Sequence, residues 1–418
     1  MRTNKKLSVD LTQYHEETVK YIQKTGLDYR KSLGQYFTPK SIREALIKRL
    51  PNDIENPRIL DPACGTGEFL FTAKEYFSNP DLFGWEIDKK LVDIAVKIVP
   101  EAKIVQRDSL LDETYNQFDF VIGNPPYYEF KPSKELRNKF GLVINGRTNI
   151  FSLFIYQGIK WLKPGGYLAF VVPSSMNNGA YFLNLRKYIS DQSNIEYLHI
   201  IEDAMVFHGA LQSTMLLILK KGRNQGNYIF KKNGILIFSE DADYIKKSFD
   251  DKETLSDLGF IVKTGRLVWN QNKHLLTNNP SEGIPLIWAH NIGNGELIFP
   301  VLNKDSKPQY VKINNYDKGP AIVVNRITGS VKASKLKAAL IPPGMKFVAE
   351  NHVNVIFPPK NRDSFLFNSS SYYKDSVNLL KNIIQQIISE ESMNIIRCIT
   401  GNTQVSKNEL EKLLPVRI

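Results

Sequence analysis

The sequence contains little cysteine and no long apolar run. Its 418 residues include two cysteines, Cys64 and Cys398, which have no paired spacing. This argues against a disulfide framework and against a zinc site, so no bound metal is expected. No run of roughly 18 apolar residues occurs, so we expect no membrane span, and the N-terminal residues are too polar for a secretory signal. These absences favour a cytoplasmic protein.

Acidic residues are outnumbered by basic ones. The chain has 55 Lys and Arg against 43 Asp and Glu, a net charge of +12. Such an excess indicates a polyanionic partner, although charge alone does not distinguish DNA, RNA and anionic lipid. The length is sufficient for two domains, since one domain takes about 100–200 residues.

The first half of the chain has an α/β pattern. From residue 57, short apolar runs alternate with helix-like stretches, which is typical of a parallel sheet. Strands are expected at residues 58–60, 81–85, 102–105, 118–122 and 166–172. Two further runs, 195–201 and 213–219, lie too close together for a crossover helix. We therefore predict a Rossmann-like sheet that is parallel except for an antiparallel hairpin at its edge.

The pattern changes after residue 225. Residues 255–360 contain short β-type runs broken by Gly, Pro and Asn. Apolar residues between 379 and 388 recur at helical spacing, which predicts an amphipathic helix that packs on a core. We therefore expect two domains, an α/β domain over residues 1–240 and an α+β domain over residues 241–418.

Polar side chains end the first four predicted strands. They are Asp61, Glu86, Asp108 and Asn124, in chain order. In open α/β sheets, ligands bind outside the carboxyl ends of the strands. Each acid alone could equally cap a helix or lie in a solvated loop. Their positions at successive strand ends favour one shared ligand site.

The loop after the first strand indicates which ligand is bound. Gly65 and Gly67 would let a ligand approach the backbone where a helix begins. The dinucleotide-binding pattern Gly-x-Gly-x-x-Gly is incomplete, because residue 70 is Leu. This argues against a nicotinamide or flavin cofactor. Glu86 could accept hydrogen bonds from both ribose hydroxyls, and Asp108 could accept one from an adenine amino group. Strand-end carboxylates also suit a cation. We therefore predict S-adenosylmethionine, a sulfonium that carries an adenosine.

Asn124-Pro125-Pro126-Tyr127 follows the fourth predicted strand directly. An adenine amino nitrogen is a poor nucleophile because its lone pair is delocalised into the ring. The side-chain oxygen of Asn124 and the carbonyl of Pro125 could accept its two hydrogens and favour the nucleophilic geometry. The tandem prolines restrict the backbone, and Tyr127 offers a face on which an extruded base can stack. The alternative interpretation is a surface polyproline turn.

These residues resemble the gamma class of amino-group DNA methyltransferases and are similar to the TaqI-like type II enzymes. Residues 33–39 match the N-terminal cofactor motif of that class, and the other motifs follow in the gamma order at 61–67, 86–88, 108–109 and 124–127. The resemblance implies that residues 1–240 are catalytic. It also implies that residues 241–418, with similar pieces at 262–265, 350–352 and 400–405, form a DNA target-recognition domain.

The resemblance also implies roles for individual residues. Thr38 would lie near the methionine part of the cofactor, Ala63 in the glycine loop, Glu86 with Ile87 at the ribose and adenine, and Asp108 with Ser109 at the adenine edge. The full set of expected cofactor-binding residues is Thr38, Asp61, Ala63, Gly65, Glu86, Ile87, Asp108, Ser109 and Pro126. Phe207 is expected to stack on the flipped base opposite Tyr127, unless it belongs to the core.

We therefore predict a site-specific methyltransferase that acts on the N6 amino group of an adenine flipped out of double-stranded DNA. It would belong to a restriction-modification system, act as a monomer, and work independently of a cognate endonuclease. An RNA adenine-N6 methyltransferase is the main alternative, because the cofactor chemistry is the same. A protein glutamine methyltransferase would not need the basic second domain, and a non-enzymatic DNA-binding module would leave the motif at 124–127 unexplained. Cytosine methylation more often uses Ser in place of Asn124.

Overall fold

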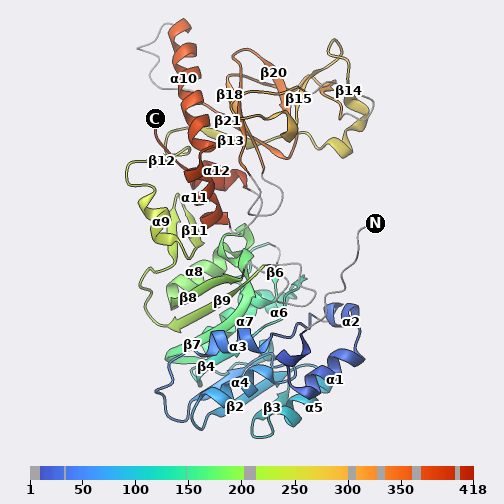
Figure 1. Cartoon of the computed structure of the whole chain (residues 1–418), viewed down its shortest axis with the longest axis vertical. Helices are drawn as coiled ribbons and strands as arrows, with labels where there is room; N and C mark the ends of the chain where they lie inside the picture. The colour runs from blue at the N-terminus through green and yellow to red at the C-terminus, as the bar shows by residue number, and fades with distance from the viewer. Residues whose placement is uncertain are drawn as a thin grey trace. The chain divides into compact units, whose positions relative to one another are not determined.

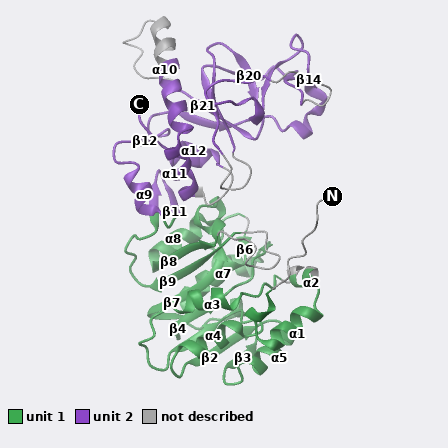
Figure 2. Cartoon of the chain, viewed as in Figure 1, with its two compact units in different colours: residues 1–229, 238–240 green, residues 230–237, 241–418 purple. Residues whose placement is uncertain are grey.

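The computed structural model describes residues 10–32, 34–146, 148–201, 213–299, 307–326, 335–359, 369–400 and 405–418. It contains two compact units (Figure 2). Unit 1 comprises residues 1–229 and 238–240, and unit 2 comprises residues 230–237 and 241–418. The assignment of separate roles to residues 1–240 and 241–418 stays a prediction.

Unit 1 is built on a seven-stranded sheet with the order β3-β2-β1-β4-β7-β9-β8 (Figure 1). Its strands are β1 (Arg58–Asp61), β2 (Asp81–Glu86), β3 (Lys103–Gln106), β4 (Phe118–Gly123), β7 (Leu162–Pro173), β8 (Ser193–Ile201) and β9 (Thr214–Lys221). The first five of these in sheet order run parallel, whereas β9 pairs antiparallel with both β7 and β8. The predicted parallel sheet with an antiparallel edge pair is confirmed.

Helices cover both faces of this sheet. Alternate residues of β4 point to opposite faces, as the two-residue period of a strand requires. Phe120 and Ile122 join a core cluster with α3 (Lys40–Ile47), α4 (Glu68–Tyr76) and α5 (Lys89–Ile98). The other face is covered by α7 (Phe151–Trp161) and α8 (Leu183–Gln192), which contact β7 and β8. This layering leaves the carboxyl ends of the parallel strands as the edge where loops can form a site.

Shorter elements complete unit 1. The N-terminal segment forms a 3-10 turn η1 (Leu11–Gln13), α1 (Glu16–Lys24) and α2 (Leu27–Ser32). Between β4 and α7 lie β5 (Glu129–Phe130), α6 (Lys134–Phe140) and β6 (Thr148–Asn149), where β5 and β6 pair antiparallel. Single turns of 3-10 helix, η2 (Ser109–Leu111), η3 (Ser174–Asn177) and η4 (Ala180–Phe182), follow β3 and β7.

Unit 2 is an α+β structure, as expected. Its sheets have the orders β13-β21-β18-β19 and β14-β16-β15-β20-β17, with further pairs β10-β11 and β12-β22. The strands of the four-stranded sheet are β13 (Ile261–Thr264), β18 (Ala321–Asn325), β19 (Ala338–Ile341) and β21 (Val353–Phe357). Those of the five-stranded sheet are β14 (Leu276–Thr277), β15 (Ile284–Ile287), β16 (Tyr310–Val311), β17 (Asp317–Lys318) and β20 (Lys346–Ala349). The paired strands are β10 (Ile229–Lys232), β11 (Ile235–Phe238), β12 (Glu253–Thr254) and β22 (Pro415–Val416). The helices are α9 (Ala242–Lys247), α10 (Ser369–Ile387), α11 (Glu390–Thr400) and α12 (Lys407–Lys412).

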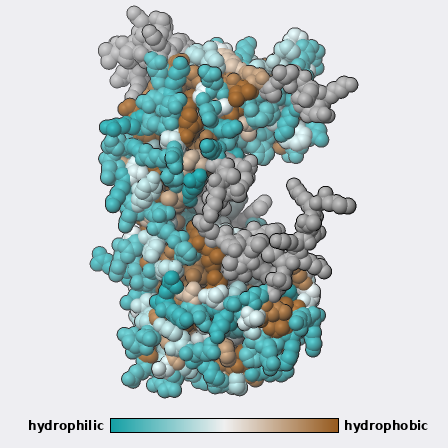
Figure 3. All heavy atoms as spheres, viewed as in Figure 1, coloured by the Kyte–Doolittle hydropathy of each residue, from teal (hydrophilic) through white to brown (hydrophobic). Residues whose placement is uncertain are grey.

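The predicted amphipathic helix is α10. Leu380, Ile383, Ile384 and Ile387 on one side of it are buried against one face of the four-stranded sheet. The opposite face of that sheet packs on β20 through residues such as Val323 and Phe347. Hydrophilic residues cover most of each unit on the face drawn in Figure 3. Among the helices of the described residues, none is long and apolar enough to cross a membrane.

Candidate active site

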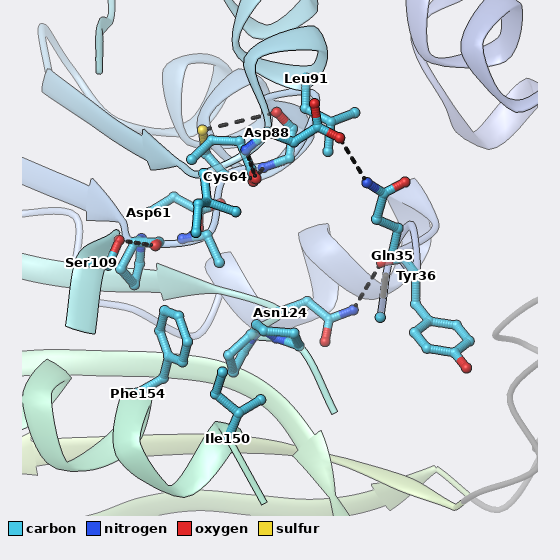
Figure 4. Close-up of a pocket in the computed structure, with 18 of the residues that line it drawn as sticks. Gln35, Tyr36, Asp61, Cys64, Asp88, Leu91, Ser109, Asn124, Ile150 and Phe154 are labelled. Atoms are coloured by element: carbon cyan, nitrogen blue, oxygen red, sulfur yellow. Dashed lines mark hydrogen bonds between the residues drawn. The ribbon is translucent and has the colours of Figure 1, made fainter. Parts of the chain in front are cut away.

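A pocket of about 400 Å³ lies at the carboxyl ends of the parallel strands of unit 1 (Figure 4). All of the predicted cofactor-binding residues line it, together with both predicted hydrogen-bond acceptors for the target amino group: Thr38, Asp61, Ala63, Gly65, Glu86, Ile87, Asp108, Ser109, Pro126, Asn124 and Pro125. Tyr127 is not part of the lining. Phe207 lies outside the described residues, so its predicted stacking role stays a prediction.

Asp61 ends β1 and is buried at the bottom of the glycine loop. Its Oδ1 accepts a hydrogen bond of 3.1 Å from the backbone N–H of Ala63. Gly123, with φ of +142°, ends the neighbouring strand, and a Cβ there would lie 2.6 Å from Asp61 Oδ1, so a glycine is needed for this close approach. Burial raises the pKa of Asp61 to about 8, the Ala63 N–H opposes this shift, and the negative charge of Glu86 adds to it. A cation beside Asp61 would stabilise its ionised form.

Glu86 ends β2 and binds three backbone amides. Its Oε1 accepts from the N–H groups of Ile87 and Asp88, and its Oε2 accepts from that of Gly65, each at 2.9 Å. Burial raises the pKa of Glu86, while these hydrogen bonds oppose the shift. Because each carboxylate oxygen has two lone pairs, Oε1 is fully engaged and Oε2 has one acceptor direction left. Glu86 therefore fixes the glycine loop to β2 and is able to take one further donor at Oε2.

Three further residues of the pocket lining, Ile87, Asp108 and Ser109, offer an apolar surface and polar groups. Ile87 is apolar but 66% exposed. Asp108 caps η2, since its Oδ1 accepts a hydrogen bond of 2.9 Å from the N–H of Leu110. The Ser109 hydroxyl donates to the carbonyl of Pro62 at 2.5 Å. The hydrogen of Ser109 is thus used to fasten the loop after β3 to the loop after β1.

Cys64 also lines the pocket, within the glycine loop. Its side chain is 5% exposed and forms no disulfide. Burial, followed by the negative charges of Asp61 and Glu86, raises the pKa of this thiol well above its usual value. The thiol is therefore neutral at ordinary pH.

Gln35 is a pocket residue to which sequence reasoning gave no role. Its Nε2 donates to Asp88 Oδ2 at 3.2 Å, and its Oε1 accepts from the Tyr21 hydroxyl at 2.9 Å. Asp88 Oδ1 also caps α5 through the N–H of Lys90. The sequence offered one signal, the position of Gln35 inside the motif at 33–39. This chain of contacts attaches the N-terminal segment to the end of β2.

Ile150 and Phe154, at the start of α7, line the pocket as well (Figure 4). The remaining α7 residues are almost all buried. Apolar residues in such a helix are normally core residues, so nothing in their spacing distinguishes these two side chains as part of a site.

The Asn124 side chain is held by the segment that precedes α3. Its Nδ2 donates to the carbonyl of Tyr36 at 3.3 Å and to Thr38 Oγ1 at 3.0 Å. In Figure 4 the ring of Tyr36 points away from Asn124. The segment 36–38 therefore contacts the Asn124 amide through its backbone and the Thr38 hydroxyl.

Tyr127 lies beside Asn124 and the end of β7. Its hydroxyl contacts Asn124 Oδ1 and is 2.7 Å from the carbonyl of Val171. Its ring centroid is 6.3 Å from that of Phe151 in an edge-on arrangement, and 6.5 Å from that of Tyr36 with an angle of 18° between the rings. Burial raises the pKa of Tyr127 well above its usual value. The neutral hydroxyl therefore has one hydrogen for two acceptors.

Sequence reasoning missed a buried ion pair, one partner of which, Glu68, lines the pocket. Arg43 Nη2 on α3 is 2.7 Å from Glu68 Oε2 on α4, and the two side chains are 2% and 7% exposed. Arg43 Nη1 also donates to the carbonyl of Thr38 at 2.5 Å, and Glu68 Oε1 accepts from the N–H of His15 at 2.8 Å. These contacts attach residues 15 and 38 to the helix that begins after the glycine loop.

A parallel sheet that begins with the order β3-β2-β1-β4, has an antiparallel strand near its edge, and carries a strand-end pocket of this kind defines an S-adenosylmethionine-dependent methyltransferase. Within this class, the chain belongs to the N-6 DNA methylase family, whose model matches residues 19–268. The predicted cofactor and the predicted enzyme class, a DNA methyltransferase acting on adenine N6, are thereby confirmed.

The chain is also similar to individual proteins. It is 28% identical to Type II methyltransferase M.CvrRI of Paramecium bursaria Chlorella virus XZ-6E, over 82% of this chain and 88% of that protein. It is 24% identical to Type II methyltransferase M.BsuBI of Bacillus subtilis, over 93% of this chain and 88% of that protein. A solved structure of a type I restriction-modification system methyltransferase subunit from Streptococcus thermophilus matches with a TM-score of 0.37 and 19% identity, over 51% of this chain and 52% of that chain.

Proposed function

We propose that the protein is a gamma-class, TaqI-like enzyme of a type II restriction-modification system, which methylates N6 of an adenine flipped out of double-stranded DNA. The observation that carries this proposal is the position of Asn124 and Pro125 in the lining of the pocket that also contains the strand-end carboxylates. The gamma order of the motifs from residue 33 to residue 127 supports the subclass. Both relatives are named type II methyltransferases, which supports the type II assignment.

The pocket residues fit S-adenosylmethionine. The volume of about 400 Å³ is within the usual range of small-molecule sites, about 300–1,000 Å³. Asp61 suits a cationic group, Glu86 Oε2 suits a ribose hydroxyl, and Ile87 offers an apolar surface to an adenine ring. When bound there, S-adenosylmethionine would supply an electrophilic methyl group.

Asn124 and Pro125 activate the target amino group in the proposed mechanism. Asn124 Oδ1 and the Pro125 carbonyl accept its two hydrogens and direct the nitrogen lone pair towards the methyl donor. The amino group then replaces the Tyr127 hydroxyl at Oδ1, and the hydroxyl keeps its contact with the Val171 carbonyl. The Tyr127 ring, with Phe207 opposite, stacks on the extruded base and offsets part of the unstacking free energy.

Unit 2 is proposed to be the DNA target-recognition domain. A group of aromatic and basic side chains around the buried Trp288 supports this role. Lys273 Nζ is 5.4 Å from the ring centroid of Trp269, and Lys307 Nζ is 4.7 Å from that of Trp288. Trp269 is 36% exposed, and His290 stacks on Trp288. Ammonium groups held in this way are available to DNA phosphates, which provide much of the affinity of DNA-binding proteins.

The remaining parts of the proposal concern partners and location. We propose that the enzyme acts as a cytoplasmic monomer on double-stranded DNA and independently of any cognate endonuclease. An RNA adenine-N6 methyltransferase is less favoured, because the family model is a DNA methylase by name and both relatives are named type II methyltransferases.

Methylation of a plasmid by the purified protein tests this proposal. Single-molecule sequencing should find N6-methyladenine at one short sequence, and Asn124→Ala should remove the modification while cofactor and DNA still bind. A structured RNA of the same length serves as the competing substrate. Methylation of the RNA alone, or methylation by Asn124→Ala within a few-fold of wild type, would contradict the proposal.

A further inference from the structure

The two ends of the Asn124 side-chain amide have nearly the same shape but opposite hydrogen-bonding character. Its oxygen accepts and its NH₂ group donates. The target amino group is itself a donor, so only the orientation that presents Oδ1 to it is productive. An amide turned by 180° would oppose donor to donor, and activation of the target would fail.

The segment 36–38 distinguishes the two orientations. The Tyr36 carbonyl, 3.3 Å from Nδ2, can only accept, and Thr38 Oγ1, 3.0 Å from Nδ2, supplies a second acceptor. The two hydrogens of Nδ2 therefore each have a partner. Turning the amide would lose the bond to Tyr36 and place Oδ1 against its carbonyl oxygen, which is repulsive, whereas the Thr38 hydroxyl can donate or accept and therefore strengthens the orientation that the Tyr36 carbonyl selects.

The backbone of Thr38 is itself held by a hydrogen bond from Arg43. Arg43 Nη1 donates to the Thr38 carbonyl at 2.5 Å, and Thr38 is 4% exposed. Because Arg43 is paired with buried Glu68, the backbone of Thr38 is held in place by a side chain that has little freedom of its own.

We infer that Thr38 is a positioning residue for methyl transfer: its hydroxyl holds the Asn124 amide with Oδ1 towards the target base. This inference rests on the proposed role of Asn124. It goes beyond the cofactor-binding role expected for Thr38, because it assigns to the hydroxyl an effect on the chemical step.

Thr38→Val tests the inference, since valine keeps the shape and lacks the hydroxyl. With cofactor and DNA both saturating, we expect its single-turnover rate to fall about tenfold, the factor that matches loss of one hydrogen bond worth roughly 1.4 kcal/mol. The Tyr36 carbonyl still holds the amide, so the loss should be partial. Thr38→Ser restores the hydroxyl and should return the rate to within about twofold of wild type.

Two further measurements distinguish a positioning role of Thr38 from a role in cofactor binding alone. Thr25→Val is the control, because this hydroxyl donates to the Tyr21 carbonyl at the end of α1 and Thr25 is not part of the pocket lining, so its rate should equal wild type. Calorimetry of each variant gives the cofactor Kd. An unchanged Thr38→Val rate with a raised cofactor Kd, or a Thr38→Ser rate as low as that of Thr38→Val, would overturn the inference. Rapid turnover by Asn124→Ala would instead contradict the proposed role of Asn124.

Discussion

We expect the buried carboxyl group of Asp61 to make cofactor binding dependent on pH. Burial raises the pKa of its carboxyl group to about 8 from an ordinary value of 3.8. A cationic cofactor binds better to the ionised form, so we expect its affinity to increase as the pH rises through about 8 and then to level off. Calorimetric titration with S-adenosylmethionine between about pH 6 and pH 9 measures this dependence.

Asp61→Asn provides the control for this titration. Its cofactor affinity should be weaker and nearly independent of pH over the same range, and a slope equal to wild type would rule out Asp61 as the titrating group. The pH dependence of the free energy of unfolding has the opposite sign. Because the folded pKa is raised, the contribution of Asp61 to the free energy of unfolding is fully present below about pH 4 and decreases as the pH rises through about 8.

Tyr127 combines an aromatic face with a hydroxyl that contacts Asn124 Oδ1. This oxygen is the atom proposed to accept a hydrogen from the target amino group. Tyr127→Phe keeps the stacking surface and frees Asn124 Oδ1, so its single-turnover rate should stay within about tenfold of wild type. Tyr127→Ala removes stacking worth about 1–3 kcal/mol per base and should be slower than the Phe variant. Equal rates for the two variants would show that the ring does not stack on the target.

Local sequence motifs located the site residues but not their hydrogen-bond partners. The order Asp61, Glu86, Asp108, Asn124 predicted the shared edge of the sheet, because the ends of parallel strands must meet there. Glu86 was expected to bind both ribose hydroxyls, yet its Oε1 is occupied by two backbone amides. Whether backbone amides reach Glu86 Oε1 depends on how the loop after β2 turns, and no single residue type specifies that turn.

At the scale of elements, α3 and α4 are joined by the Arg43–Glu68 pair. Arg43→Ala would leave Glu68 buried without its cation, which costs about 3–5 kcal/mol of the free energy of unfolding. Urea denaturation measures the loss. Lys40→Ala on the same helix is the matched control. Lys40 is exposed and pairs with Glu44 at 3.7 Å and with Glu75 at 3.8 Å, and such surface pairs contribute at most about 1 kcal/mol each. Similar losses in both variants would contradict the assignment.

The strands of unit 1 were predictable because each is a short apolar run next to a turn or a helix. The Arg43–Glu68 pair was not, since its partners are separated along the chain and each is an ordinary charged residue of an amphipathic helix. The N-terminal helices α1 and α2 also escaped prediction. They become part of the site through long-range contacts, such as the bond from Tyr21 to Gln35.

At the scale of the whole molecule, the net charge of +12 should make DNA binding depend strongly on salt. We expect Lys307→Ala to weaken binding to all DNA sequences and to lower the slope of log Kd against log salt by about one. Lys312→Ala is the control in the same unit, because Lys312 is paired with Glu282, and its slope should stay close to wild type. Fluorescence anisotropy at several salt concentrations gives both slopes. An unchanged slope for Lys307→Ala would remove this residue from the DNA interface.

The fold of unit 2 was predictable only as a class. Its strands are short and broken by Gly and Pro, so the sequence indicated an α+β structure without the pairing of its two main sheets. The amphipathic pattern of α10 was clear because Leu380, Ile383, Ile384 and Ile387 form one continuous stripe. The residues that read a DNA sequence depend on the shape of both molecules and could not be extracted from local patterns.

The neutral thiol of Cys64 has a consequence for the chemical durability of the protein. Thiolates, rather than thiols, react with alkylating agents and peroxides, and burial also raises the pKa of Cys398, to about 12. The two cysteines of the chain are therefore both poor nucleophiles in the folded state. Methylation activity should survive storage in air without a reducing agent, and iodoacetamide should label the protein only as it unfolds. Alkylation of Cys64, mapped separately from that of Cys398, can therefore report on unfolding of the glycine loop.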